Sequence, residues 1–196
     1  MKKLILVLVI SFSVVKSKVV HAQAWEKNTK VISLGVGLSQ FYHLDNYYYY
    51  NEYYHGATHR SYTLLTEQFN LQGEFGIHKY VGLGFTTGVG GRGPFANYYN
   101  GEFNIPVGVI SNFHFYQLIA DNSKKNIHAD KMDIYAGINI GSGIAFTFYP
   151  NLTRSVPLFF GGVHAGIRYY ISDKVGVNAE LGLGKSLING GFVFKL

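Results

Sequence analysis

Residues 175–196 alternate between apolar and polar or small side chains with a period of two. Every second residue from Val175 to Leu183 is apolar, and the positions between hold glycine, Asn178 or Glu180. The apolar side of the pattern resumes with Ile188, Phe192, Phe194 and Leu196. This is the period of a β-strand, in which successive side chains point to opposite faces. Because the apolar face is large while the other is mostly glycine, the pattern predicts two strands of a closed membrane barrel with a tightly filled interior.

The same period occurs six more times along the chain. We expect these strands at residues 31–39, 66–77, 81–90, 102–114, 133–148 and 159–169, before the last two at 175–184 and 188–196. Pro106 lies inside the fourth and predicts a bulge or an end of the pairing there, because proline cannot donate to a ladder. Strands of about 9–11 residues suit a tilted path across a bilayer. The predicted fold class is therefore all-β, an eight-stranded antiparallel up-and-down transmembrane β-barrel.

An even number of strands places both termini on one side of the membrane. With a periplasmic N-terminus, the predicted extracellular loops are 42–62, 91–101, 149–157 and 185–187, and the periplasmic links are 78–80, 118–131 and 172–174. Loop 42–62 is long and rich in tyrosine, which suggests an ordered extension of the strands that flank it. Tyrosines near strand ends fit the interfacial girdle, namely Tyr42, Tyr62, Tyr80 and Tyr169. Those farther into the loop are candidates for contact with a ligand or partner, namely Tyr47, Tyr48, Tyr49, Tyr50, Tyr53 and Tyr54.

The N-terminus has the pattern of a secretory signal peptide. Met1-Lys2-Lys3 precedes an apolar run from Leu4 to Val15, with small residues at Ala22 and Ala24. The run is too short to cross a bilayer as a helix. We expect residues 1–24 to be the signal, cleaved after Ala22 or Ala24, and residues 25–196 to form the barrel.

Charge and composition exclude other classes of protein. The expected signal holds four of the 17 lysines and arginines and none of the 11 acids, so the net charge falls from +6 to +2 without it. No basic stripe remains that would indicate nucleic-acid binding. The chain has no cysteine, which excludes disulfides and thiol chemistry.

Charged residues on the inward face are predicted to pair inside the barrel, since an unpaired buried charge is costly. The expected lumenal charge network comprises Glu74, Glu102, Asp133, Arg168, Glu180 and Lys195, centred on Arg168 and Glu180. An eight-stranded barrel is just wide enough for side chains to fill it, so a structural plug is favoured over a narrow ion path.

Several histidines are candidates for metal ligands or for catalytic groups. His43, Asp45, His55 and His59 share the first loop, but their spacing matches no compact metal site. His114 and His164 point inward without a nucleophile that spacing singles out. We therefore expect no enzyme activity, no cofactor and no metal.

Residues 168–184 resemble the penultimate hairpin of the outer-membrane protein beta-barrel domain family. The resemblance rests on the tyrosine-rich strand, the Ser172-Asp173-Lys174 turn and the run Ala179-Glu180-Leu181-Gly182-Leu183-Gly184. The family, often labelled "porin family", contains small barrels similar in architecture to OmpX and the OmpA membrane domain. Many of them end on phenylalanine, whereas Lys195-Leu196 follows Phe194 here. The resemblance implies a location in the outer membrane and no agreed activity.

Pattern and resemblance together favour a monomeric outer-membrane barrel with a structural or adhesive role through its tyrosine-bearing loops. Its expected partners are outer-membrane lipid, the barrel-assembly machinery during insertion, and a host or cell-surface ligand, but no nucleic acid. The alternatives are a narrow porin or transport barrel and a lipid-modifying outer-membrane enzyme. A soluble lipocalin-like barrel is disfavoured, because its outer face would have to be polar.

Overall fold

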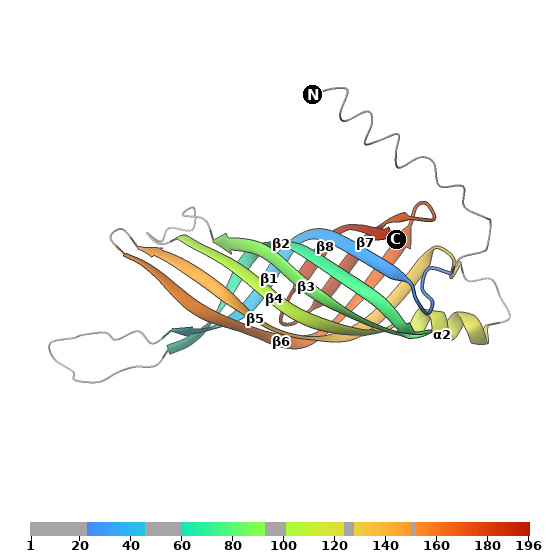
Figure 1. Ribbon diagram of the computed structural model, residues 1–196, viewed down its shortest axis with the longest axis horizontal. Coiled ribbons are helices and arrows are strands. Elements are labelled where there is room, and N and C mark those ends of the chain that lie inside the picture. Colours follow the sequence, from blue (N-terminus) through green and yellow to red (C-terminus); the bar gives the residue numbers. More distant parts are fainter. Residues whose placement is uncertain (1–22, 46–59, 93–100, 124–127, 150–151) are drawn as a thin grey trace, which may run out of the picture.

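The computed structural model describes residues 23–45, 60–92, 101–123, 128–149 and 152–196, which form eight strands and one short helix (Figure 1). In chain order these are β1 (Lys30–Asp45), β2 (Arg60–His78), β3 (Val81–Arg92), β4 (Gly101–Phe113), α2 (Phe115–Asn122), β5 (Met132–Tyr149), β6 (Leu152–Tyr170), β7 (Val175–Gly182) and β8 (Ile188–Lys195). Each strand pairs antiparallel with the next, and β8 pairs back with β1. The predicted all-β, eight-stranded up-and-down barrel is confirmed.

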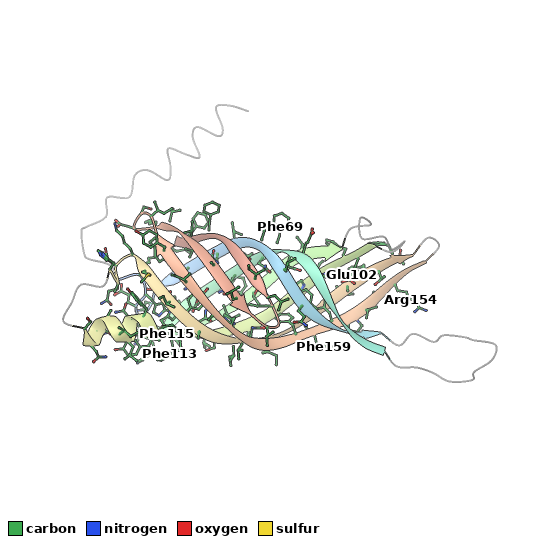
Figure 2. The ribbon with its side chains drawn as sticks, turned by 180° about the vertical axis from the view of Figure 1, so that it is seen from behind. Phe69, Glu102, Phe113, Phe115, Arg154 and Phe159 are labelled. Atoms are coloured by element: carbon green, nitrogen blue, oxygen red, sulfur yellow. The ribbon has the colours of Figure 1, made fainter. Side chains whose placement is uncertain are left out.

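The two faces of the barrel differ as the period of two predicts. Apolar side chains project outward and are exposed around the wall, and Figure 2 shows Phe69, Phe113 and Phe159 at this outer surface. Polar side chains of the same strands are buried inside. Such an outer face is unfavourable in water and suits contact with hydrocarbon. In the described part of the chain, no helix has both the length and the apolar character needed to cross a membrane.

The barrel has two distinct ends. The start of β1, the C-terminus, α2 and the links 79–80 and 171–174 lie at one end, which we call the terminal end (Figure 1). The opposite end, toward which β1 leads into residues 46–59, is the loop end.

The number of strands in the wall falls from eight to six toward the loop end. β7 and β8 have 8 residues each, whereas β1 has 16 and β6 has 19. β1 pairs with β8 only from Val31 to Leu38. Farther along, Tyr42 and His43 of β1 pair directly with Phe159 and Leu158 of β6. The long strands therefore close on one another beyond the short β7–β8 hairpin.

Two glycines make room for large inward side chains. A Cβ added to Gly82 would overlap the side chain of Glu74, with its Cδ 2.8 Å away. A Cβ added to Gly166 would lie 2.5 Å from Cζ of Tyr135. Both distances are shorter than side chains tolerate, so glycine at these positions fixes where Glu74 and Tyr135 lie inside the barrel.

Several strands are longer than the sequence pattern indicated. β1 and β2 remain paired as far as Asp45 and Arg60, which confirms the expected ordered extension for residues 42–45 and 60–62, while residues 46–59 lie outside the described part of the chain. The predicted loop 149–157 is wrong, because β6 already begins at Leu152 and Pro157 lies within it opposite Ile144. On its other edge, β6 pairs with β1 at residues 158 and 159 and with β7 from His164 onward. Pro157 has no partner on that edge, so its missing N–H leaves no hydrogen bond of that ladder unmade.

Pro106 interrupts one ladder but not the other. It keeps its partner Gly143 on β5. On the β3 side the pairing stops after Val107 and resumes at Asn104 in the same register. The predicted end of pairing is thus confirmed for the β3 ladder alone, without a bulge.

The predicted link 118–131 is wrong in part, because it overlaps helix α2. The helix begins directly after buried His114, and Leu118 and Ile119 are exposed on its surface. Its sequence contains neither glycine nor proline, which favours a helical turn over an extended link.

Candidate functional site

A cluster of buried charges lies inside the barrel near the terminal end. The period of two turns Glu74 of β2, Asp133 of β5 and Arg168 of β6 into the lumen, and their side chains are at most 1% exposed. The guanidinium of Arg168 donates to Oε2 of Glu74 at 2.5 Å and to Oδ2 of Asp133 at 3.3 Å. One cation thus joins two carboxylates from strands that are not neighbours in the wall.

His114 completes this terminal cluster, which we define as Glu74, His114, Asp133 and Arg168. Its Nδ1 lies 2.9 Å from Oδ1 of Asp133, and its Nε2 lies 2.9 Å from Oε1 of Glu74. Carboxylates accept hydrogen bonds, so a ring bonded to one through each nitrogen donates from both and is the imidazolium. The cluster then holds two cations and two anions, and its charges balance.

The N-terminal segment closes the barrel over the terminal cluster. The Trp25 ring stacks on the His114 ring with centroids 3.6 Å apart and planes 7° from parallel. Trp25 is 0% exposed and packs with Ala24, Val31, Tyr170 and Val193. The Arg168 guanidinium also lies 5.8 Å from the centre of the Trp25 ring. Residues 23–29 therefore close this end of the lumen by inserting the Trp25 side chain, and we call this segment the plug.

A second buried ion pair lies deeper in the lumen. The Lys185 ammonium pairs with Glu180 and also donates to Oε1 of Gln72 at 2.6 Å. The preceding Gly184 has a φ of 83°, a conformation that favours glycine, and lies directly before the residue that enters the lumen. We call Gln72, Glu180 and Lys185 the central cluster.

Tyr135 lies between the two clusters and contacts both. Its hydroxyl donates to Oε2 of Glu180 at 3.0 Å. Its ring lies 4.3 Å from the guanidinium carbon of Arg168. The charged groups therefore form one continuous column in the lumen.

His164 takes part in hydrogen bonds rather than in an ion pair. Its Nε2 donates to Oδ1 of Asn112 at 2.8 Å, and its Nδ1 accepts from Asn139 at 3.2 Å. Both ring nitrogens are thus engaged by amide side chains. The two imidazoles share no hydrogen-bond partner, since His114 is bonded to Asp133 and Glu74 while His164 is bonded to Asn112 and Asn139.

The loop end of the lumen is closed by apolar side chains. Phe41, Ala145, Leu158 and Phe160 form a buried cluster where the wall has narrowed to six strands. The rings of Phe41 and Phe160 lie 5.6 Å apart. Together with the Trp25 plug, this cluster leaves the polar column enclosed at both ends.

Of the six residues in the expected charge network, the structure brings three together: Glu74, Asp133 and Arg168. Glu180 instead pairs with Lys185. The expectation of one network centred on both Arg168 and Glu180 is corrected accordingly, since the two belong to separate clusters linked by Tyr135.

The other two predicted members lie apart. Glu102 lies toward the loop end, opposite Arg92 of β3 and Thr147 of β5, and accepts from Asn104 at 3.5 Å (Figure 2). Lys195 lies at the terminal end, where its ammonium donates to the carbonyl of Gln23 at 2.7 Å.

The expected network did not include Gln72, His114, Tyr135, Lys185 or Trp25. Lys185 follows the last alternating residue of its strand and was assigned to a loop. Trp25 is the only tryptophan of the sequence and directly follows the expected signal peptide. A large aromatic residue at that position could have indicated a buried anchor before the first strand. The period of two places His114 inward but gives no sign that it pairs with Glu74 and Asp133. The tyrosines expected to make surface contact, 47–50, 53 and 54, lie outside the described residues.

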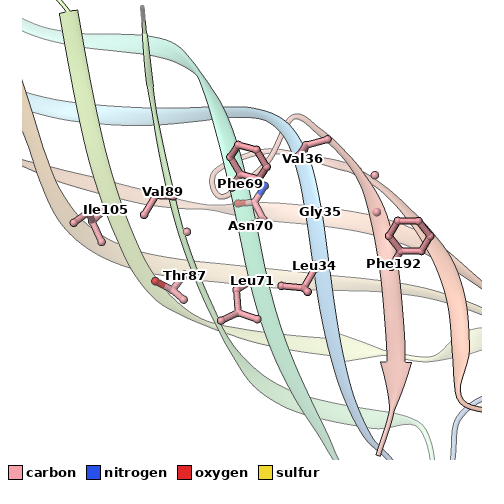
Figure 3. A pocket seen from close by; sticks show the side chains of 13 residues that line it. Leu34, Gly35, Val36, Phe69, Asn70, Leu71, Thr87, Val89, Ile105 and Phe192 are labelled. Atoms are coloured by element: carbon pink, nitrogen blue, oxygen red, sulfur yellow. The ribbon is translucent and has the colours of Figure 1, made fainter. Parts of the chain in front are cut away.

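An apolar groove of about 580 Å³ lies on the outer wall and extends from β8 across β1, β2 and β3 to Ile105 of β4 (Figure 3). Leu34, Phe69 and Phe192 are among its lining residues, and Asn70 and Thr87 are the polar ones. A groove lined in this way suits an acyl chain. The residues that line it include neither a histidine nor a charged side chain.

The rim of the terminal end is tied together by Asp121 of α2. It forms an ion pair with Lys79 at 2.8 Å and accepts from the Tyr80 hydroxyl at 2.8 Å. Burial of the Asp121 carboxyl opposes its ionisation, but bonds from Lys79, Tyr80 and Gln117 outweigh this and hold its pKa below the usual value. The same ion pair raises the pKa of Lys79. The helix is thereby held against the link between β2 and β3.

Comparison with known proteins gives matches of fold alone. The sequence matches no protein-family model, and its comparison with curated proteins gave no match. The N-terminal β-barrel domain of Pseudomonas aeruginosa OprF superimposes with a TM-score of 0.53 at 10% identity, covering 87% of this chain and 98% of that domain. The outer membrane protein OprG of P. aeruginosa gives a TM-score of 0.50 at 11% identity, covering 89% of this chain and 99% of the other. The chain therefore has the fold of the small outer-membrane β-barrels.

Proposed function

We propose that this protein is a monomeric outer-membrane barrel that conducts no solutes and acts through the surface it presents at its loop end. The apolar outer face and the fold shared with small outer-membrane barrels support the location. With the terminal end in the periplasm, the loop end faces outward. The observation that carries the proposal is the enclosed lumen, in which ion pairs fill the centre and apolar groups close each end.

A transport role through the lumen is disfavoured by the same arrangement. A solute would have to displace Trp25 from its stack on His114 and separate Arg168 from two carboxylates. Separating buried ion pairs leaves uncompensated charges, at a cost of several kcal/mol. A lipid-modifying activity finds no acid or base among the residues that line the outer groove.

The surface-contact role rests on the long strands and the tyrosines between them. β1 and β2 pair beyond the point where β8 ends, so they carry the first loop away from the membrane-spanning part of the wall. Tyrosine offers a large, rigid contact area with a polar tip, which suits recognition of a protein or glycan surface. We propose Tyr47–Tyr50, Tyr53 and Tyr54 as the contact residues.

The purified protein is expected to show no stable conductance in a planar lipid bilayer, because its lumen is filled. A Trp25→Ala variant should remain folded but show brief openings more often, since the stack over His114 is lost. An Ile140→Ala variant, altered on the outer face, should behave as the wild type. A large and stable conductance from the wild type would contradict the enclosed lumen and favour the porin alternative.

Replacing Tyr47–Tyr50 with serine is expected to leave folding intact while reducing binding of expressing cells to host matrix, glycan or other cells at least several-fold. Folding is read from the heat-dependent gel mobility of the barrel, and binding from counts of attached cells. Serine in place of Tyr98 and Tyr99, in another predicted loop, is the matched control. If the four-serine variant folds and binds as the wild type does, the adhesive role loses its main support.

A further inference from the structure

The segment that plugs the terminal end begins within the expected cleavage region of the signal. The main-chain N–H of Ala24 donates to the carbonyl of Ala129 at 2.7 Å. The carbonyl of Gln23 accepts a hydrogen bond from the ammonium of Lys195. The same ammonium lies over the Tyr170 ring, 4.8 Å from the ring centre. Gln23 and Ala24 therefore tie the plug to two separate parts of the barrel.

We propose that signal peptidase cleaves after Ala22, so that the mature chain begins at Gln23 and keeps the whole plug. This inference rests on the proposed export of the chain to the outer membrane. Two cleavage positions have small residues in the required places, Val20-His21-Ala22 and Ala22-Gln23-Ala24. The sequence does not choose between them, whereas the contacts of the folded chain do.

Cleavage after Ala24 would remove both ties and bury a new charge. Ala24 is 1% exposed and belongs to the apolar cluster around Trp25, so its loss would leave a gap there. Trp25 would become the first residue and carry an ammonium group. Trp25 is fully buried, so the new cation would be desolvated at the closed end of the lumen.

Cleavage after Ala22 avoids both penalties. Gln23 is only partly buried, so a terminal ammonium on it stays at a residue that reaches the surface. Its carbonyl remains available to Lys195, and the N–H of Ala24 remains an ordinary peptide donor to Ala129. The product that begins at Gln23 is thus the one that closes the barrel.

The test is the mass of the N-terminal peptide of the full-length protein, expressed with its own signal and purified from the outer-membrane fraction. We expect a peptide that begins at Gln23, with or without loss of one ammonia from that glutamine. A peptide that begins at Trp25 would overturn the inference. Absence of the protein from the membrane fraction would instead contradict the proposed location, so the two failures are distinguishable.

Two substitutions test the same site by the shift from precursor to mature size on a gel, which does not depend on folding. Val20→Phe places a bulky residue three positions before the proposed cut and should slow processing at least tenfold. Ala24→Phe blocks only the other position and should leave the rate of processing unchanged. The reverse result, slow processing of the Ala24 variant alone, would show cleavage after Ala24.

The role of the two extra residues is tested with refolded barrels that begin at Gln23 or at Trp25. The shorter barrel is expected to lose its folded gel mobility at a lower temperature in detergent. Equal melting of the two barrels would show that Gln23 and Ala24 do not hold the plug.

Discussion

Replacement of Arg168 by alanine is expected to lower the free energy of unfolding of the barrel by about 3–5 kcal/mol. The guanidinium is 0% exposed and is bonded to both Glu74 and Asp133. Without it, the His114 imidazolium faces two carboxylates alone, and one negative charge is left buried and unpaired. The lost packing against the rings of Trp25 and Tyr135 adds to the effect.

Unfolding in urea with lipid vesicles, followed by heat-dependent gel mobility, measures this effect. The surface variant Lys174→Ala, in the exposed turn before β7, is the control and should change stability little. A double variant, Arg168→Met with Glu74→Gln, restores the balance of charge and should recover much of the lost stability. An alanine variant as stable as the wild type would contradict the buried cluster, and a double variant no better than the single one would show that charge balance is not the cause.

Replacement of Lys185 by alanine is expected to have a similar cost, about 3–5 kcal/mol. Lys185 supplies the only ammonium in the described part of the chain that pairs with Glu180, and it also bonds Gln72 of β2. After its removal, the Glu180 carboxylate keeps the Tyr135 hydroxyl but has no cation beside it. Lys185 lies in the connection between β7 and β8. If its side chain were at the surface there, its replacement by alanine would change the free energy of unfolding little.

The same unfolding measurement separates these outcomes. Lys185→Met combined with Glu180→Gln removes both charges and should be more stable than Lys185→Ala. The matched control is Lys131→Ala, at an exposed lysine before β5. If the alanine variant unfolds at the same urea concentration as the wild type, Lys185 lies at the surface and the central cluster does not exist.

The strand pattern was predictable because the wall of a barrel imposes one rule on every residue. A side chain such as Phe69 or Val163 points out and its neighbours point in, so the period of two decides strand after strand. Strand ends were less predictable, since beyond the hydrocarbon the rule weakens. Pro157, which the pattern places in a loop, lies inside β6 and pairs with Ile144 of β5. Proline is tolerated there because no pairing with β1 or β7 occurs at this residue.

The partners within the lumen were not predictable from the same pattern. The alternation of side chains indicates that Glu74, Arg168 and Glu180 point inward. Their height along the barrel axis depends on the shear between strands, which the sequence does not reveal. Residues outside the strands add to this difficulty. Lys185 reaches the lumen from a turn, and Trp25 reaches it from the segment before β1, where no periodicity marks the inward side.

The narrowing of the wall toward the loop end has a consequence for association between copies. Where β8 ends, β1 would expose a row of unpaired N–H and C=O groups, and β6 would do the same where β7 ends. Free edges of this kind are templates for pairing with another chain, which leads to aggregation. Here the two edges pair with each other, Tyr42 and His43 of β1 with Phe159 and Leu158 of β6. Between this pairing and the end of β8, the N–H of Gln40 donates to the carbonyl of Gly184, and the N–H of Leu187 donates to the carbonyl of Leu38. The long strands can therefore project from a crowded membrane surface without offering a neighbouring copy an edge along this seam.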